Sequence, residues 1–176
     1  VLEPLKVIIT NYPEGQVEEL DSPNHPQDES FGMRKTPFCN EIYIEQEDIR
    51  EEANKKYKRL VMGKAVRLRN AYIIQCDEVI KGADGEVIEL HCSYVPGSSG
   101  QTPEGAPKPR GVIHWVSARH GINAEVRMYD RLFVHPSPDA AENKEDKGFT
   151  DLLNPEIGRA HVCTPVTDVS RMPSSA

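Results

Sequence analysis

The feature that most constrains the fold is a hydrophobic period of two that begins near residue 65. Val66 and Leu68 are two positions apart, and the runs 72–79 and 87–94 flank a Gly- and Asp-containing turn at 82–85. Successive side chains of a strand point to opposite faces, and a short link of this composition between two strands is typical of a β-hairpin. The centre of the chain therefore predicts antiparallel strands.

Other short segments suit the same kind of fold. Many short strands joined by Gly- and Pro-rich turns are typical of β-barrels and sandwiches, so we expect a mainly β fold. Further strands are expected at residues 1–12, 41–44, 111–117 and 124–133, with loops at 13–30 and 96–109 and an acidic linker at 136–146.

Residues 46–60 depart from this pattern. Ile49, Ala53, Tyr57 and Leu60 recur at helical spacing, and acidic residues precede basic ones, which suits a helix dipole. The segment predicts one short helix, with Tyr57 packed toward the core rather than stacked on a ligand.

Positive charge is concentrated in residues 49–70. This segment holds eight basic and two acidic residues, a formal charge of +6 in a chain whose net charge is −7. An acidic protein that gathers its cations in one block presents a site for an anion, and Arg and Lys beside Tyr57 and Asn70 suit RNA better than a small metabolite. The alternative interpretation is a solvated charged face without a ligand.

Several classes of protein are excluded by features that the chain lacks. No apolar run approaches the ~20 residues of a membrane helix, and the start has neither the basic region nor the cleavage site of a signal peptide. Because it lacks an initiator Met, we expect the chain to begin inside a longer protein. The cysteines form no CxxC pair, which argues against zinc or a disulfide framework and predicts buried thiols in a reducing compartment: Cys39, Cys76, Cys92 and Cys163.

Residues 157–176 fit no element of this scheme. Their sequence, IGRAHVCTPVTDVSRMPSSA, has no usable period, and it resembles an in-frame translation of a common sequencing adapter in which Cys163 stands at a UGA codon. We hypothesise that this tail is non-native and disordered, and that the natural part is 1–156. Genuine genomic codons at this position in the transcript would contradict the hypothesis.

A series of motifs in one order points to a known family. They are SPNHP at 22–26, GMRKTPF at 32–38, EIYIEQEDIREEANKKYKRL at 41–60, VRLRNAYII at 66–74, GVIHWVS at 111–117 and EVRMYDRLF at 125–133. Together they resemble the C-terminal half of the glutaminyl-tRNA synthetases, which in that family forms two antiparallel β-barrels that bind the tRNA anticodon loop. The resemblance covers residues 1–156. It implies an incomplete proximal barrel, because the tail replaces the strands expected after Glu156, and this predicts an open sheet edge with exposed apolar surface.

The resemblance also implies a set of anticodon contacts. Lys58 and Arg59 would approach the third anticodon base and its backbone, and the VRLRN strand would place Arg67, Arg69 and Asn70 near the first anticodon base. On a strand, Arg67 and Arg69 share one face, and a guanidinium can grip a phosphate bidentately or stack on a base. Single-stranded loops are where proteins can read base edges. The full implied set is Lys58, Arg59, Arg67, Arg69, Asn70 and Gln27.

Enzymes of that family join glutamine to its tRNA using ATP, with Mg²⁺, in a catalytic half of class I type. The HIGH-like and KMSKS-like motifs of that half are absent from this chain. We therefore expect no catalytic residue, metal or cofactor in the chain itself, tRNA(Gln) as its partner, no membrane or DNA, and a cytoplasmic location. L-glutamine and ATP would bind the catalytic half. His114 is expected to pack within its strand, opposite in direction to Trp115.

Two alternatives stay open. The eukaryotic-type glutamyl-tRNA synthetases share the barrel architecture, although the wording YKRL and RLRNAY favours the glutamine enzyme. From another class, a non-catalytic β-barrel module could use the basic block to bind an acidic protein. Binding of tRNA transcripts for glutamine and glutamate across a salt series separates the three.

Overall fold

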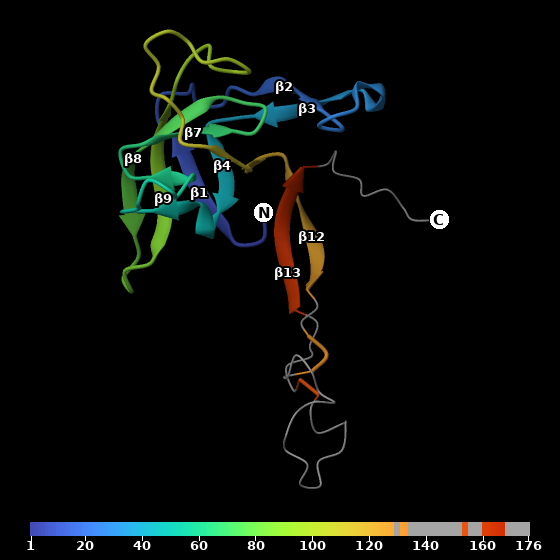
Figure 1. Ribbon diagram of the computed structural model, residues 1–176. Coiled ribbons are helices and arrows are strands. Elements are labelled where there is room, and N and C mark those ends of the chain that lie inside the picture. The colour runs from blue at the N-terminus through green and yellow to red at the C-terminus, as the bar shows by residue number, and fades with distance from the viewer. Residues whose placement is uncertain (129–130, 134–152, 155–159, 168–176) are drawn as a thin grey trace, which may run out of the picture. The chain divides into compact units, whose positions relative to one another are not determined.

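The computed structural model describes residues 1–128, 131–133, 153–154 and 160–167 of the chain. The largest described sheet has seven strands in the order β10-β7-β8-β9-β1-β4-β11, of which β1, β4, β7, β8 and β9 are labelled in Figure 1. Most neighbours pair antiparallel, whereas β1 with β9 and β10 with β7 pair in parallel. The strands are β1 (Pro4–Ile9), β4 (Glu41–Glu45), β7 (Ala65–Leu68), β8 (Ile73–Lys81), β9 (Val87–Tyr94), β10 (Val112–Ile113) and β11 (Val116–Ser117).

The two edge strands of this sheet are almost consecutive in sequence. β10 pairs with β7 at one edge and β11 with β4 at the other, yet only His114 and Trp115 separate them. The step from Ile113 to Val116 spans at most about 11 Å, so the edges must approach each other. The sheet therefore curls, as the mainly β, barrel-type prediction requires. The single strand expected at 111–117 is divided, because its two ends pair with opposite edges.

Three two-stranded sheets accompany the main sheet. β2 (Glu18–Pro23) pairs with β3 (Met33–Phe38), β5 (Ile49–Arg50) with β6 (Leu60–Val61), and β12 (Gly121–Met128) with β13 (Ala160–Thr167). The described helical elements are the short 3-10 turns η1 (Glu29–Phe31) and η2 (Gln46–Asp48). None of the helices in these ranges is long and apolar enough to cross a membrane.

The core lies inside the curl of the sheet. Burial alternates along β1, where Leu5, Val7 and Ile9 are buried and the residues between them face outward. The Phe38 ring makes edge contacts with the Tyr12, Tyr72 and Trp115 rings at centroid distances of 5.1–5.2 Å. Such aromatic pairs add to the free energy gained by burial, so strands far apart in sequence share one packed centre.

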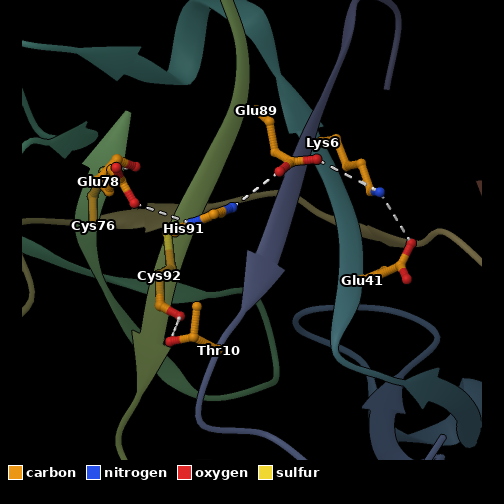
Figure 2. Close-up of polar contacts among 8 residues, drawn as sticks. All are labelled: Lys6, Thr10, Glu41, Cys76, Glu78, Glu89, His91 and Cys92. Carbon is orange, nitrogen blue, oxygen red and sulfur yellow. Dashed lines mark hydrogen bonds and ion pairs between the residues drawn. The ribbon is translucent and has the colours of Figure 1, made fainter. Parts of the chain in front are cut away.

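The outer face of the sheet bears a line of charged side chains across β8, β9, β1 and β4, here called the outer charge row (Figure 2). His91 lies 3.2 Å from Glu78 through Nδ1 and 3.0 Å from Glu89 through Nε2. The Lys6 ammonium lies 3.6 Å from Glu89 and 3.4 Å from Glu41. Lys6 and His91 thus each have two carboxylates beside them.

Three of the cysteines are free and buried, which confirms the prediction of buried thiols for Cys39, Cys76 and Cys92. Cys76 and Cys92 lie opposite each other on β8 and β9. The hydrogen bond between them lowers the pKa of Cys76, and the same bond together with burial raises the pKa of Cys92. The side chain of Cys163 lies outside the described residues.

The prediction of a helix at residues 46–60 is wrong. Only the single turn of η2 is helical, and Ile49 of β5 pairs with Leu60 of β6. Both of these side chains are buried, whereas Ala53 and Tyr57 between them are only partly buried. The apparent helical spacing arises because two strands reach the same core on either side of a loop at 51–59.

Two further segments differ from expectation. The polar stretch 13–30 includes strand β2, which pairs with β3 along its whole length from Glu18↔Phe38 to Pro23↔Met33. Residues 160–167 form strand β13, unlike the disorder expected for the tail, since main-chain pairing demands no hydrophobic period. A strand does not decide the origin of the tail, so the non-native hypothesis, the boundary at 156 and the open barrel edge stay predictions. The linker expected at 136–146 lies outside the described residues.

Candidate nucleic-acid interface

Arg69 and Asn70 follow directly after β7 in a turn whose backbone is firmly held. The Arg69 N–H donates to the Ile113 carbonyl at 2.9 Å, and the Trp115 indole N–H donates to the Arg69 carbonyl at 3.0 Å. Asn70 has a φ of 56°, in the left-handed region that Asn tolerates better than most residues. Both side chains are exposed. The turn thus presents a guanidinium and an amide from a rigid support.

The same turn borders a small hollow, here called the arginine notch. The hairpin β2–β3, the turn after β7 and the link between β10 and β11 supply its walls. The lining residues are Ser22, Arg34, Thr36, Arg69, Asn70, His114 and Trp115.

His114 is exposed at the rim of this notch, so the expectation that it packs within its strand is wrong. Trp115, its neighbour, is buried, which confirms that the two side chains point in opposite directions. Desolvation by the surrounding protein lowers the pKa of His114, and the positive charges of the amino terminus, Arg69 and Arg34 lower it further, while Glu45 opposes them. Burial and a local excess of positive charge thus both disfavour the imidazolium form of His114.

Lys58 and Arg59 lie at the end of the 51–59 loop. The Asn54 side chain accepts hydrogen bonds from the N–H groups of Lys56 and Tyr57, which forms a tight local turn in place of a helix. Arg110 donates to the Asn54 carbonyl at 2.7 Å. A Cβ atom on Gly111 would collide with the Lys58 carbonyl, so the loop backbone packs directly on that glycine.

Arg59 is partly neutralised by neighbouring acids. Its Nη1 atom lies 3.2 Å from Asp48 and 3.4 Å from Glu47, and 46% of its side chain stays exposed. Burial raises the pKa of Asp48 in spite of the Arg59 charge. Tyr57 donates to the Glu47 carbonyl at 2.8 Å, and the Arg50 guanidinium lies 4.6 Å over its ring. Tyr57 is therefore neither a core residue nor a free stacking platform.

Arg67 is occupied inside the protein. Its guanidinium donates to the Ser98, Gln101 and Ala71 carbonyls and to the Thr102 hydroxyl. These bonds fasten the loop at 96–109 to strand β7. The guanidinium is thus committed to internal acceptors in this structure, unlike that of Arg69.

Gln27 lies apart from the other candidates in the chain segment that joins β2 to β3. It is exposed and borders a depression formed with Pro23, His25 and Met33. The His25 ring stacks on Phe31 at 5.2 Å, which gives this tip an aromatic surface.

The structure brings together some of the sequence-predicted residues and not others. Arg69 and Asn70 share the notch, and the Lys58–Arg59 loop is linked to it through residues 110–113, since Gly111 packs on Lys58 and Ile113 bonds to Arg69. Arg67 and Gln27 belong to other surroundings. Sequence reasoning missed Arg34. The period of two along MRKTPF places Arg34 and Thr36 on one face, which was an available signal once a strand was assigned there.

No group of three or more His, Cys, Asp or Glu suited to hold a metal ion occurs among the described residues. The described residues combine a curled β-sheet with exposed cations beside the arginine notch. Their arrangement suits a β-fold module that binds an anionic polymer.

Comparisons with known proteins give the particular family. A model described as the anticodon-binding domain of class I tRNA synthetases (E and Q) matches residues 1–95, and a second model of the same description matches residues 112–163. The first match covers more than half of the chain. The chain belongs to this family of anticodon-binding domains. The second match extends into the first residues of the segment 157–176.

Similar curated proteins are glutamine–tRNA ligases. The chain is 53% identical over 156 residues to that of Pseudomonas syringae pv. tomato, covering 89% of this chain and 27% of the relative. It is 54% identical over 155 residues to that of Pseudomonas putida, covering 88% and 27%, and 51% identical over 156 residues to that of Aliivibrio fischeri, covering 89% and 27%. The chain thus spans 27% of the length of these relatives.

Proposed function

We propose that this chain binds the anticodon loop of tRNA(Gln) as the anticodon-binding part of a glutamine–tRNA ligase. The observation that supports this most is the identity of 51–54% to proteins of that name across nearly nine-tenths of the chain. The family models alone cover both glutamate and glutamine enzymes, so the names of the relatives favour glutamine over the glutamyl alternative.

The residue roles in this proposal follow the local geometry. Arg69 and Asn70 contact the first anticodon base, because their backbone is held while their side chains are free to meet an unstacked nucleotide. Lys58 and Arg59 contact the third base and its backbone, with Asp48 orienting the Arg59 guanidinium. Gln27 adds a polar contact from the β2–β3 tip. The internal bonds of Arg67 support an indirect role, in which it fixes the 96–109 loop beside the site.

The activity of the larger enzyme is part of the same proposal. The ligase would join L-glutamine to tRNA(Gln) using ATP with Mg²⁺ in a catalytic half that is not represented in this chain. Binding of the anticodon by residues of this chain would then select the correct tRNA for that half. The setting of such an enzyme is the cytoplasm.

A salt series with defined RNAs tests the proposal. The chain is titrated with transcripts of tRNA(Gln), of tRNA(Glu) and of tRNA(Gln) with an exchanged anticodon. We expect binding to weaken steeply with salt and to favour the glutamine anticodon by about tenfold. Binding that ignores the anticodon would defeat anticodon reading, and failure to bind any RNA would favour the protein-interaction alternative.

Two variants separate base reading from charge steering in that assay. Arg59→Ala should weaken binding and reduce the anticodon preference. Lys64→Ala removes an exposed charge from the same basic segment and should weaken binding evenly across the transcripts. Equal behaviour of the two variants would remove Arg59 from the set of base-reading residues.

A further inference from the structure

The arginine notch contains a cation whose position is set by strand pairing. Arg34 lies opposite Ser22 in the β2–β3 register, and its Nη1 atom donates to the Pro23 carbonyl at 2.9 Å. Thr36, on the same face of β3, donates to the buried Ser22 hydroxyl at 3.1 Å. One nitrogen of the half-buried guanidinium is therefore anchored to the backbone, which holds the Arg34 fork at the wall of the notch.

No carboxylate is among the residues that line the notch. Within the described ranges, neither Arg34 nor Arg69 forms an ion pair, whereas Lys35, beside Arg34 in sequence, lies 2.7 Å from Asp21. In a chain of net charge −7, two arginines that face one hollow without a carboxylate are unusual. Their repulsion costs free energy that a bound anion would offset.

We propose that the arginine notch binds a phosphate group of the RNA backbone, with Arg34 and Arg69 as its two guanidinium contacts and His114 at its rim. The guanidinium fork matches the geometry of phosphate oxygens, and the exposed Asn70 amide adds a neutral donor. This inference rests on the proposed function, which it deepens. Arg34 would hold the backbone in register, and Arg69 and Asn70 would contact this phosphate beside the first anticodon base that they meet in the proposed function.

Arg34→Gln tests the proposal, with Lys35→Gln as its matched control. Both changes remove one positive charge from β3, but Lys35 is exposed and paired with Asp21. In the salt series, Arg34→Gln should weaken binding of the tRNA(Gln) transcript about five- to tenfold and reduce the slope of log K against log salt by roughly 0.7–0.9. Lys35→Gln should change affinity less than about twofold.

The pattern across RNAs distinguishes this proposal from the proposed function. Arg34→Gln should weaken all transcripts by the same factor and leave the anticodon preference unchanged. If the wild-type chain prefers the glutamine anticodon and Arg34→Gln behaves like Lys35→Gln, the notch is not a phosphate site. If the wild-type chain shows no preference while Arg34→Gln still lowers affinity and slope, anticodon reading fails and the notch stands.

A pH series gives a second measurement that does not depend on the stability of the Arg34 variant. The charged groups that act on His114 are the amino terminus, Arg69, Arg34 and Glu45. A bound phosphate would favour the imidazolium, so affinity should rise about two- to fivefold between pH 7.5 and 5.5. His114→Gln should flatten this profile. A wild-type profile that is already flat, or one that His114→Gln leaves unchanged, would overturn the placement of phosphate beside His114.

Discussion

The outer charge row and the arginine notch are both charged surfaces on one curled sheet, yet their charges are arranged in opposite ways. In the row, Lys6 and His91 each lie between two carboxylates (Figure 2). In the notch, Arg34 and Arg69 face one hollow without an ion-pair partner in the described part of the chain. Charged side chains that form ion pairs with one another do not require a ligand. Neighbouring cations without a carboxylate partner mark a place where an anion is expected to bind.

The same contrast divides the basic segment. The Arg67 guanidinium donates its hydrogen bonds to the loop that contains residues 98–102. Arg59 forms ion pairs with Asp48 and Glu47. Arg69 has an exposed side chain on a backbone that is held by hydrogen bonds. A local formal charge of +6 therefore overstates the number of cations ready for RNA. Internal partners therefore bear on each cation's role: Arg67 is committed to the protein, whereas Arg59, although paired, keeps 46% of its side chain exposed.

The largest effect is expected from Trp115→Ala, which would break the support beneath the notch. Trp115 is 4% exposed, packs on Phe38 and donates to the Arg69 carbonyl. The lost ring and hydrogen bond should lower the free energy of unfolding by about 3–5 kcal/mol, measured by urea denaturation. His91→Gln in the outer row is the control and should cost less than about 1 kcal/mol. Equal effects would show that the notch side of the sheet is no better supported than the outer face.

The next effect is expected from Gly111→Ala, which separates the Lys58–Arg59 loop from the notch. The added Cβ would meet the Lys58 carbonyl, a backbone atom that cannot turn aside. We expect a loss of about 2–3 kcal/mol in the free energy of unfolding, with weaker RNA binding as the loop shifts. Gly82→Ala is the matched control, because there the Cβ would meet only the flexible Glu86 carboxylate. A Gly111 variant as stable as the Gly82 variant would contradict close packing of the loop.

A smaller loss of about 1–2 kcal/mol is expected from Arg67→Ala, since several carbonyls lose a donor but stay near solvent. The 96–109 loop should become more accessible to limited proteolysis. Arg67→Lys should restore little, because an ammonium cannot reproduce the fork that spans Ser98 and Gln101. An Arg67→Ala chain with wild-type stability and a reduced salt slope would instead place Arg67 on the RNA.

Local pattern was enough to predict much of the fold. The hairpin of β8 and β9 and its Gly85 turn, with φ of 83°, follow from short-range periodicity and turn chemistry. The path of residues 112–117 could not be predicted in this way. Residues 112–113 pair with one edge of the sheet and residues 116–117 with the other, and such long-range pairing leaves no local signal. The 46–60 error has a similar origin: Ile49 and Leu60 meet through pairing, and their separation of 11 residues happens to match a helical period.

The candidate site was predictable only in part, because motifs are local in the sequence whereas the partners of a side chain depend on the tertiary structure. Motif resemblance reached Arg69 and Asn70, but no local signal showed that Arg67 would fasten a loop some 30 residues away, as its bond to Ser98 does. Arg34 enters the notch only because β2 and β3 pair in the observed register and the β7 turn meets them. The partners of a cation are a tertiary property, so the sequence could indicate where charge is dense but not which charge is free.

The smallest effect is expected in the outer charge row itself, from a double-mutant cycle of Lys6→Met and Glu89→Gln. Burial acts to lower the pKa of Lys6, but Glu41 and Glu89 outweigh it and raise that pKa above 10.5. A raised pKa means that the ion pairs stabilise the fold below about pH 10.5 and that this contribution is lost as the pH rises through the folded-state pKa. Because 36% of the Lys6 side chain is exposed, the coupling energy at pH 7 should stay below about 1 kcal/mol.

The cycle is measured by urea denaturation at pH 7 and again near pH 11, where the coupling should diminish. RNA affinity should change less than about twofold in Lys6→Met, in contrast to Arg34→Gln. A Lys6 variant that lowers the salt slope as much as Arg34→Gln would show that the paired cations of the outer charge row also bind RNA, and the distinction between row and notch would fail.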